Sequence, residues 1–310
     1  MRRRTRIAVV GSANVDLTTF GDRFPKPGET LFGDRFDLGW GGKGANQAVA
    51  ARLCGADVSM VARVGDDLFG PGTVENLVSY GIDTSHVRRV PGVSSGVAPI
   101  FVEPNGQNRI LVVKGANDHL TAADVDAAAP MLSQAACIVL QFEIPLDVVY
   151  HTIRFARRHG IPCIVNPAPG QRIDLSELAG VDYVIPNETE AETLTGLSVG
   201  SVEEARACAA HLVSEGLGTV IITLGAQGAL LARDGQSELL PAYNVVARDT
   251  TGAGDAFVGS FATFLGEGLS ERDAIARANL YAALSTMSAG TQKSFVTRER
   301  FEAEWQQRNR

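Results

Sequence analysis

Six short runs of apolar, often β-branched residues recur along the chain, and each is followed by polar residues or glycine. They cover residues 7–10, 58–64, 138–140, 163–165, 183–185 and 220–222. Their hydrophobicity is continuous rather than alternating, which is typical of strands buried on both faces. Helical spacing is found between runs, at 45–53, 146–159, 202–214 and 253–265. The pattern predicts an α/β fold with a doubly wound, mostly parallel sheet flanked by helices.

Two stretches interrupt this alternation of strands and helices. Residues 15–40 and 94–114 contain short apolar segments separated by turn-forming residues, including Pro-Asn-Gly at 104–106. Their turn chemistry is typical of hairpins. We therefore expect a single domain, residues 1–310, in which about 15–40 and 94–114 form a small β-sheet that acts as a lid.

The polar clusters after the apolar runs indicate a ligand site. Asn14 and Asp16 come after the first run, and Asn187 and Glu190 come after the fifth. In parallel α/β sheets, ligands bind beyond the carboxyl ends of the strands. Because every run is followed in this way, the sequence predicts an enzyme with one cleft.

Composition narrows the class of protein. The chain of 310 residues is 45% hydrophobic and carries a formal net charge of −7. Lysine and arginine cluster only in the first six residues, so no nucleic-acid partner is expected. The four cysteines are scattered, which favours buried thiols in a reducing compartment. No apolar run is long enough for a signal peptide or a membrane span, so we expect a cytoplasmic protein without a membrane partner.

The stretch Gly-Trp-Gly-Gly-Lys-Gly-Ala-Asn at 39–46 partly fits two phosphate-binding motifs. Gly39, Gly41 and Gly44 have the G-x-G-x-x-G spacing, but the preceding segment alternates with polar residues and the expected downstream acid is missing. A Walker A motif would need glycine at position 37 and serine or threonine at position 44, where the chain has Asp37 and Gly44. We therefore interpret this stretch as a glycine-lined loop that opens the helix at Ala45 and lets Lys43 and Asn46 reach a ligand.

Side chains suited to sugar hydroxyls accompany this loop. Lys43 and Asn46 belong to it, and Asn14 and Asp16 follow the first predicted strand. Amides and carboxylates supply the paired donors and acceptors that hydroxyl groups need. Helix capping is the alternative role for the two asparagines.

A second glycine-rich stretch, Asp-Thr-Thr-Gly-Ala-Gly-Asp at 249–255, opens the helix predicted at 253–265. Small residues at a helix N-terminus leave backbone amides open to an anion. Asp255 could accept a proton from a hydroxyl while Gly252-Ala253-Gly254 holds a phosphoryl group. A simple first-turn charge is the alternative role. We expect the helix terminus to keep the pKa of Asp255 low, which phosphoryl transfer tolerates.

These motifs together resemble those of the PfkB family of carbohydrate kinases. Residues 41–48 resemble the N-terminal signature of the family, and residues 249–255 resemble its C-terminal signature. Between them, residues 166–169 and 186–190 are similar to core motifs, and residues 223–228 are similar to the nucleotide loop. The similarity runs in order along nearly the whole chain.

The resemblance implies a role for each matching residue. The sugar would be bound by Asn14, Asp16, Gly42, Lys43, Asn46, Glu143 and Asp255. The base would be Asp255, and the anion hole would be Gly252, Ala253 and Gly254. The nucleotide, ATP, would be bound by Asn187, Glu190, Thr223, Leu224, Gly225, Ala226, Gln227, Gly228, Gly254 and Asn279. Mg²⁺ would be held by Asn187 and Glu190, partly through water. A monovalent cation, K⁺, would be held by Asp249, Thr251, Ser285, Ser288, Gly290 and Ser294.

Two places depart from the family pattern. Asn279 stands where members often carry a histidine against the adenine, and an exposed helix residue is the alternative reading of this position. Residues 293–296 lack the usual small-residue and proline pattern next to the cation site.

The implied reaction is ATP-dependent phosphorylation of D-ribose at the 5-hydroxyl, because the chain is most similar to family members that act on ribose. Deoxyribose, a ketohexose or a nucleoside are the alternative substrates. A non-catalytic sugar-binding protein would lack Asp255 or the glycine cradle, and both are present. Family members use the lid to dimerise, so a homodimer is expected.

Overall fold

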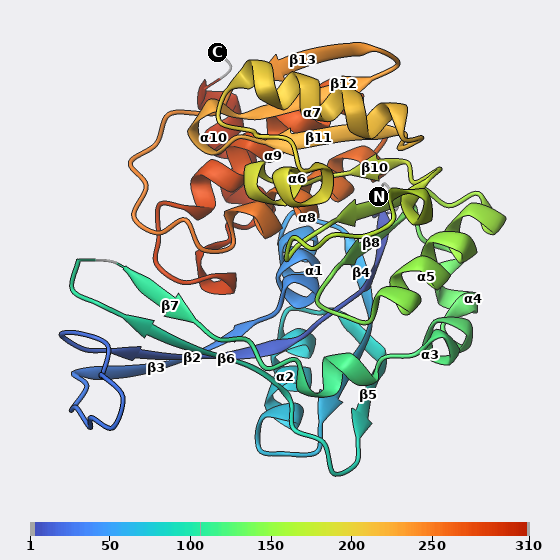
Figure 1. The fold of residues 1–310 in the computed structure, drawn as a ribbon. Coiled ribbons are helices and arrows are strands. Elements are labelled where there is room, and N and C mark those ends of the chain that lie inside the picture. The colour runs from blue at the N-terminus through green and yellow to red at the C-terminus, as the bar shows by residue number, and fades with distance from the viewer. Residues whose placement is uncertain (1–3, 106, 309–310) are drawn as a thin grey trace.

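The computed structural model describes residues 4–105 and 107–308, and among them nine strands form one large sheet (Figure 1). In sheet order these are β13 (Gln236–Leu240), β12 (Ala229–Arg233), β11 (Thr219–Thr223), β10 (Tyr183–Val184), β9 (Cys163–Asn166), β8 (Cys137–Gln141), β1 (Arg6–Val10), β4 (Asp57–Gly65) and β5 (Asp83–Val90). Neighbours from β11 to β5 pair in parallel, while β12 and β13 are antiparallel. The predicted mostly parallel sheet is confirmed.

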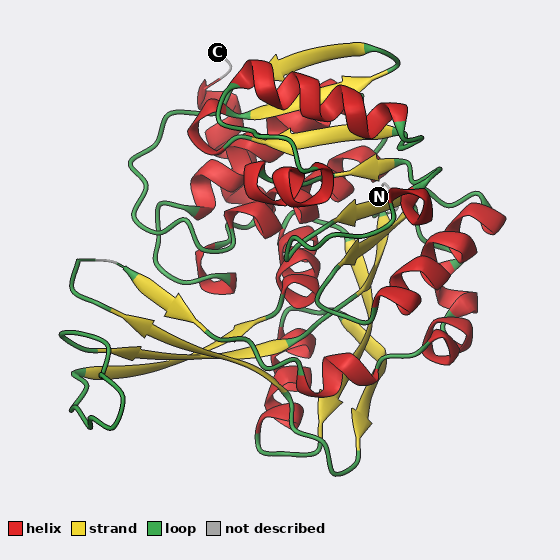
Figure 2. Cartoon of the chain, viewed as in Figure 1, coloured by secondary structure: helices red, strands yellow, loops and turns green. Residues whose placement is uncertain are grey.

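The large sheet is buried on both faces, as its continuous apolar runs predicted. Along β1, Ile7 and Val9 face one hydrophobic core, and Ala8 and Val10 face the other. Helices therefore cover both sides of the sheet (Figure 2). This layering directs the polar residues that follow each parallel strand to one edge.

The helices divide between the two cores. The first core contains residues of α1 (Lys43–Leu53), α2 (Phe69–Ser79), α8 (Ala253–Gly266), α9 (Glu271–Ser285) and α10 (Arg298–Arg308). The second contains residues of α3 (Ala122–Ala127), α4 (Ala129–Leu132), α5 (Leu146–His159), α6 (Glu188–Thr195) and α7 (Val202–Ser214). The helices predicted at 146–159 and 202–214 have the predicted bounds, and those at α1 and α8 differ by two residues or fewer.

A second, smaller sheet extends away from the main body (Figure 1). Among the described residues it has four strands in the order β3 (Arg35–Gly41), β2 (Asn14–Phe20), β6 (Gly96–Val102) and β7 (Asn108–Ile110). β2 pairs antiparallel with β3 and parallel with β6, so the two predicted hairpins join into one sheet. The turn predicted at 104–106 includes Gly106, which lies outside the described residues.

The cysteines are buried, as the sequence analysis predicted. Cys54, Cys137, Cys163 and Cys208 are all buried free thiols. In the described part of the chain, none of the helices is long and apolar enough to cross a membrane.

Candidate active site

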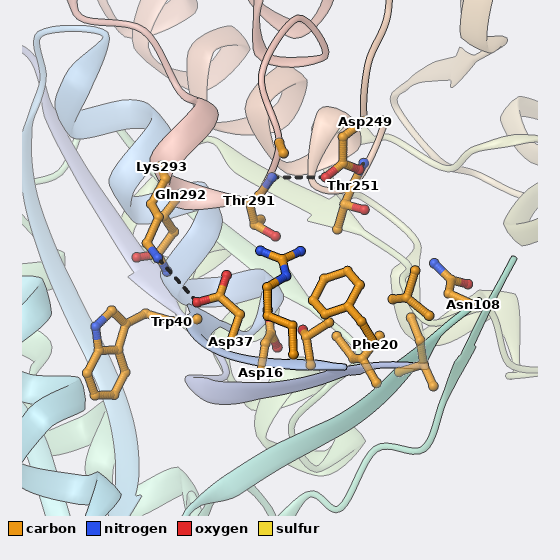
Figure 3. Close-up of a pocket in the computed structure, with 18 of the residues that line it drawn as sticks. Asp16, Phe20, Asp37, Trp40, Asn108, Asp249, Thr251, Thr291, Gln292 and Lys293 are labelled. Atoms are coloured by element: carbon orange, nitrogen blue, oxygen red, sulfur yellow. Dashed lines mark hydrogen bonds and ion pairs between the residues drawn. The ribbon is translucent and has the colours of Figure 1, made fainter. Parts of the chain in front are cut away.

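Cavities at the carboxyl edge of the large sheet bring the two glycine-rich stretches together. A central cavity of about 150 Å³ is lined by Lys43, Glu190, Gly252, Gly254 and Asp255, among others. A helix-side cavity of about 370 Å³ lies beyond it, next to β11, α8 and α9. A sheet-side cavity of about 560 Å³ lies between the small sheet and the segments 248–251 and 289–293 (Figure 3). The predicted single cleft therefore consists of adjoining compartments.

Asp255 lies in the first turn of α8 and is 6% exposed. Its Oδ2 accepts a hydrogen bond from Asn46 Nδ2 at 2.9 Å, and its Oδ1 accepts one from Gln47 Nε2 at 3.0 Å. Burial raises the pKa of Asp255 above its ordinary value, although the Lys43 ammonium and the two amides oppose this shift. The expectation of a low pKa was therefore wrong, because a sequence shows the helix terminus but not the depth of burial.

The start of α8 provides a concave stretch of backbone. Gly252 is the N-cap residue and has φ +79°, a left-handed conformation that favours glycine. A methyl group added at Gly254 would meet no described atom within 4 Å. Because the first-turn amides of a helix have no intrahelical partners, this open end can receive an anion.

The glycines of the 39–46 loop are packed rather than open. A Cβ at Gly44 would lie 2.6 Å from the Ser12 backbone nitrogen, and one at Gly42 would lie 2.6 Å from the Asn14 backbone nitrogen. These glycines let the N-terminus of α1 pack against the segment after β1. That packing places Lys43 in the lining of the central cavity and Asn46 next to Asp255.

The side chains predicted to bind a sugar form a connected group. Glu143 Oε2 accepts hydrogen bonds from the backbone amide of Lys43 at 2.9 Å, from Ser12 Oγ at 2.5 Å and from Asn14 Nδ2 at 3.5 Å. Asn14 Oδ1 also accepts one from Asn117 Nδ2 at 2.7 Å. The structure thus places Asn14, Lys43 and Glu143 together.

Asp16, on β2, differs from Glu143 and Asp255 because its carboxylate accepts no hydrogen bond from another described residue. Among the described residues, no hydrogen-bond donor or basic group pairs with its carboxylate, which lies against the backbone of Gly41. Burial, together with the negative charges of Glu143 and Asp255, raises the pKa of Asp16 to about 7. Such a group has its hydrogen-bonding capacity available for a ligand.

Lys43 is the cation among these acids. Burial alone would lower its pKa, but the carboxylates of Asp255, Glu143 and Glu190 raise it, so the ammonium stays charged. Its charge partly offsets theirs at the centre of the site. This arrangement suits an anion such as a phosphoryl group that arrives next to Asp255.

Asn187 and Glu190 form a capping box at the start of α6. Asn187 Oδ1 accepts from the Glu190 amide at 2.8 Å, and Glu190 Oε2 accepts from the Asn187 amide at 2.9 Å. Burial raises the pKa of Glu190. Both residues line the central cavity, where their oxygens suit a hard cation that keeps part of its water shell. Within the described residues, no group of three or more His, Cys, Asp or Glu is arranged to hold a metal by itself.

The helix-side cavity contains most of the residues predicted for the nucleotide. Its lining includes Thr223, Gly225, Ala226, Gly228 and Asn279. Two further predicted residues point elsewhere, since Leu224 is a core residue and the exposed Gln227 is absent from the lining.

Asn279 is buried rather than exposed on its helix. Its Nδ2 donates to the backbone oxygens of Leu240 and Pro241, both at 3.1 Å. It therefore ties α9 to the segment that follows β13, at the wall of the helix-side cavity. The alternative reading of Asn279 as an exposed helix residue is wrong.

The segments predicted to hold a monovalent cation meet at Asp249. Its carboxylate accepts hydrogen bonds from the amides of Thr251 and Gly290, both at 2.9 Å, and these bonds lower its pKa against the opposing effect of burial (Figure 3). The Ser285 and Ser294 hydroxyls donate to backbone oxygens within their own turns. Ser288 lies half-buried in the same segment. The carboxylate and hydroxyl oxygens fit an oxygen-seeking cation, although those of Asp249, Ser285 and Ser294 already have protein partners.

Comparison with known proteins then identifies the family. The family model described as "pfkB family carbohydrate kinase" matches residues 4–298. The chain belongs to this family. It is a carbohydrate kinase whose predicted resemblance is confirmed.

Similar proteins of this pfkB family include enzymes for two pentoses. The deoxyribokinase of Salmonella typhi is 48% identical over 95% of this chain and 97% of its own length. The ribokinase of Haemophilus influenzae is 39% identical over 96% of this chain and 97% of its own length. The structure of Arabidopsis thaliana ribokinase complexed with ribose and ATP aligns with a TM-score of 0.92 at 30% identity, covering 97% of this chain and 98% of that one. The chain is thus a ribokinase-like sugar kinase.

Several polar residues of this pfkB-family site had no role in the sequence analysis. Gln47 contacts Asp255, Asn117 contacts Asn14, and Gln292 Nε2 donates to Asn46 Oδ1 at 3.0 Å. Gln47 lies inside the N-terminal signature, so its position was a usable signal. Asn117 and Gln292 belong to short 3₁₀ turns and carry no motif of their own.

Proposed function

We propose that this chain transfers the γ-phosphoryl group of ATP to the primary 5-hydroxyl of a pentose, with 2-deoxyribose as the preferred sugar. The observation that carries the proposal is the position of Asp255. Its buried carboxylate lines the same cavity as Lys43 and the open start of α8. The sugar hydroxyl that accepts the phosphoryl group and the ATP that donates it can therefore meet at one acid.

The proposed step uses Asp255 as the base. The 5-hydroxyl oxygen attacks the γ-phosphorus, the bond from that phosphorus to the bridging oxygen breaks to release ADP, and Asp255 takes the hydroxyl proton. The raised pKa of Asp255 makes its carboxylate a better proton acceptor than an ordinary aspartate. Gly252, Ala253 and Gly254 form the proposed anion hole for the charge that develops on the transferred group, and Lys43 adds a positive charge. The Ala253 amide donates to the Thr250 oxygen at 3.2 Å in this structure, so the amides of Gly252 and Gly254 are the proposed donors.

The sugar is proposed to bind among Asn14, Asp16, Lys43, Asn46 and Glu143, next to Gly42. The free carboxylate of Asp16 can accept hydrogen bonds from two neighbouring hydroxyls. The small sheet that carries Asp16 also walls the sheet-side cavity, opposite the segment 289–293. Lys293 Nζ lies 4.0 Å from Asp37 Oδ1 across this opening (Figure 3), which supports a lid role for the small sheet.

ATP is proposed to lie with its base in the helix-side cavity and its phosphates toward Gly254, which lines both cavities. Mg²⁺ neutralises phosphate charge when it is bound. Asn187 and Glu190 would hold it, partly through water. K⁺ activation is proposed at the Asp249 segment, because Asp249 joins residues 249–251 to Gly290 next to the anion cradle.

Ribose and 2-deoxyribose are the two candidate substrates, and a comparison supports each. The 48% identity to a deoxyribokinase, against 39% to a ribokinase, supports 2-deoxyribose. The fold shared with a ribokinase that holds ribose and ATP supports ribose. A site that hydrogen-bonds the 2-hydroxyl should reject 2-deoxyribose by about 10⁴-fold, whereas a site built without that bond should reject ribose by only about 10²-fold. The ratio of the two kcat/KM values therefore distinguishes them.

The test is a coupled assay of ADP release with MgATP, using ribose, 2-deoxyribose, fructose and adenosine side by side. Each sugar is assayed with KCl and with choline chloride at equal ionic strength, and NMR identifies the phosphorylated position. We expect turnover of both pentoses, a higher kcat/KM for 2-deoxyribose, and stimulation by KCl. Turnover of fructose or adenosine alone would refute the pentose proposal.

A homodimer through the small sheet is proposed, because members of the resembled family use this lid to dimerise. Large apolar side chains of this sheet and its connections are exposed, with Phe32 at 101% and Leu111 at 68%. Pairing of two such faces would bury them. A cytoplasmic location is proposed because the four cysteines are buried free thiols, as a reducing compartment favours. Sedimentation of the protein at micromolar concentration tests the dimer, and a purely monomeric species would contradict it.

A further inference from the structure

The carboxylate of Asp255 is held by amides that are themselves held by other amides. Asn46 donates to Oδ2 and Gln47 donates to Oδ1. Asn46, in turn, accepts from Gln292 at 3.0 Å, and Gln292 Oε1 accepts from Asn76 Nδ2 at 2.8 Å. The result is a continuous chain of hydrogen bonds from α2 to the proposed base.

This series of hydrogen bonds runs in one direction, from Asn76 to Asp255. Each primary amide accepts through its oxygen from the residue before it and donates through its nitrogen to the residue after it. An amide group can rotate by half a turn and exchange its donor and acceptor sides. Asn46 is kept with its nitrogen toward Asp255 by both partners, because the ionised carboxylate only accepts and Gln292 offers a donor to the Asn46 oxygen.

A second amide chain supports the other carboxylate oxygen. Gln141 Nε2 donates to Gln47 Oε1 at 2.6 Å, and Gln47 Nε2 donates to both Asn166 Oδ1 and Asp255 Oδ1 at 3.0 Å. Gln47 and Gln141 are fully buried, so these hydrogen bonds are shielded from solvent. The arm through Gln292 differs, because Gln292 and Asn76 also line the sheet-side cavity.

Gln292 lies in a segment that already contacts the site in other ways. Gly290 donates to Asp249, and Lys293 reaches Asp37 on β3. Gln292 itself is 4% exposed and comes from a 3₁₀ turn, Gln292–Ser294. A shift of this turn would move the donor that fixes Asn46.

We propose that Gln292 is a positioning residue for phosphoryl transfer: it orients the Asn46 amide so that Asn46 donates to the carboxylate of Asp255. This inference rests on the proposed function, since it assigns Gln292 a task toward the proposed base. It connects the 289–293 segment at the mouth of the sheet-side cavity to the reacting centre. Gln292 touches neither sugar nor nucleotide in this role.

The decisive variant is Gln292→Glu, which keeps the shape and loses the donor. An ionised glutamate can still accept from Asn76, but it places an acceptor against the Asn46 oxygen. Asn46 then lies between two acceptors that compete for its nitrogen, so its hydrogen bond to Asp255 is weakened or lost. We expect kcat to fall by about tenfold to a hundredfold, since a hydrogen bond to a charged group is lost. The acid limb of the kcat profile should move to higher pH. Gln292→Leu supplies no opposing acceptor. It should lower kcat less and leave the acid limb of the pH profile of kcat unchanged.

The control is the same substitution at an exposed site, Gln236→Glu at the start of β13, which adds an equal charge far from the cleft. It should leave kcat and its pH profile unchanged. Thermal unfolding of the three variants separates a loss of fold from a loss of positioning. If Gln292→Glu keeps the wild-type kcat and acid limb while it remains folded, the inference is overturned.

A readout without turnover separates this inference from the proposed function. The ¹³C carboxyl signal of Asp255, assigned by its loss in Asp255→Asn, can be titrated in the protein without substrate. Lys43, Glu143, Asp16 and Glu190 also act on this group electrostatically and are the same in both proteins. The added charge alone raises the pKa of Asp255, so the matched local control is Thr291→Glu, which adds the same charge at the neighbouring residue. A titration displaced upward by more in Gln292→Glu than in Thr291→Glu supports the positioning role even if no pentose is phosphorylated. An unchanged titration counts against the positioning role of Gln292 even if the kinase proposal holds.

Discussion

The two glycine-rich stretches of this kinase look alike in sequence and differ in structure. Each opens a helix, α1 after 39–42 and α8 after 249–252. In the first, added Cβ atoms at Gly42 and Gly44 would meet backbone at 2.6 Å. In the second, an added Cβ at Gly252 would meet the Thr291 side chain, but one at Gly254 would meet no other described segment within 4 Å. The first stretch is closed by backbone at Gly42 and Gly44, whereas the second is open to a ligand at Gly254.

The comparison shows that glycine spacing alone does not define a phosphate site. At α1 the glycines allow two backbone segments to approach, and function resides in the neighbouring side chains Lys43 and Asn46. At α8 the lack of side chains exposes the backbone itself. The same residue type thus serves packing in one place and ligand access in the other. Substitutions in the two stretches should accordingly fail in different ways.

The largest expected effect concerns Asp255, the last residue of the open stretch. Asp255→Asn keeps the size of the side chain and removes the proton acceptor. We expect kcat to fall by about 10²–10⁴-fold, the usual contribution of a general base. Sugar binding, followed by calorimetry, should change little, because the amide still fills the same space.

Asp234→Asn is the matched control for this variant. Asp234 lies in the exposed turn between β12 and β13, with φ +51°, a conformation that asparagine also tolerates. Its kcat should equal that of the wild type. A near-normal kcat in Asp255→Asn would show that Asp255 is not the base.

A pair of glycine substitutions tests the comparison directly. Gly44→Ala forces a methyl group against the backbone of Gly11 and Ser12, so we expect a loss of about 1–3 kcal/mol in the free energy of unfolding. Gly254→Ala has room for its methyl group, so stability should stay level or rise by about 0.5–1 kcal/mol. The added methyl lies where the phosphoryl group is proposed to bind, and a displacement of about 1 Å there can lower kcat about a hundredfold.

Urea unfolding and steady-state kinetics on both variants give the outcome. The comparison requires opposite profiles: Gly44→Ala unstable, and Gly254→Ala stable but slow. Equal loss of stability in both would mean that the second stretch is as closed as the first. Full activity in Gly254→Ala would remove the anion cradle from the mechanism.

The fold was predictable where burial is uniform. The six continuous apolar runs are all strands, because a strand covered on both faces leaves no room for polar residues. β5, with the sequence Asp-Thr-Ser-His-Val-Arg-Arg-Val, was missed since it is an edge strand with a largely polar surface. The antiparallel β12 and β13 were missed because nothing local marks them as continuing the same sheet.

The site was predictable only in part. Asp255 and Asn46 were found because each lies in a contiguous motif. Gln292 is 246 positions away from Asn46, and a lone glutamine in a loop carries no signature. The pKa of Asp255 was misjudged because its burial depends on α1, more than two hundred positions earlier in the chain. Contacts between distant segments, rather than motifs, decide these features.

The smallest predicted effect concerns Asp16, which faces the closed stretch through Gly41. Its carboxyl has a pKa of about 7 in the free protein, because of burial and the charges of Glu143 and Asp255. Sugar hydroxyls donate to the ionised form, so sugar affinity should increase as the pH rises from 6 to 8. The change is at most about tenfold per pH unit below the pKa, and the bound state should release a proton near pH 7.

Stability should change in the opposite direction. Because the folded pKa of Asp16 lies above its ordinary value of 3.8, the neutral form stabilises the fold below about pH 4, and this contribution is lost as the pH rises through 7. Asp16→Asn should therefore bind sugar more weakly with little pH dependence, yet unfold at higher urea than the wild type at pH 8. Calorimetric titration and urea unfolding at pH 6 and 8 measure both. A wild-type affinity that is flat across this range would place the Asp16 carboxylate outside the sugar site, and Gly41 would then serve packing alone.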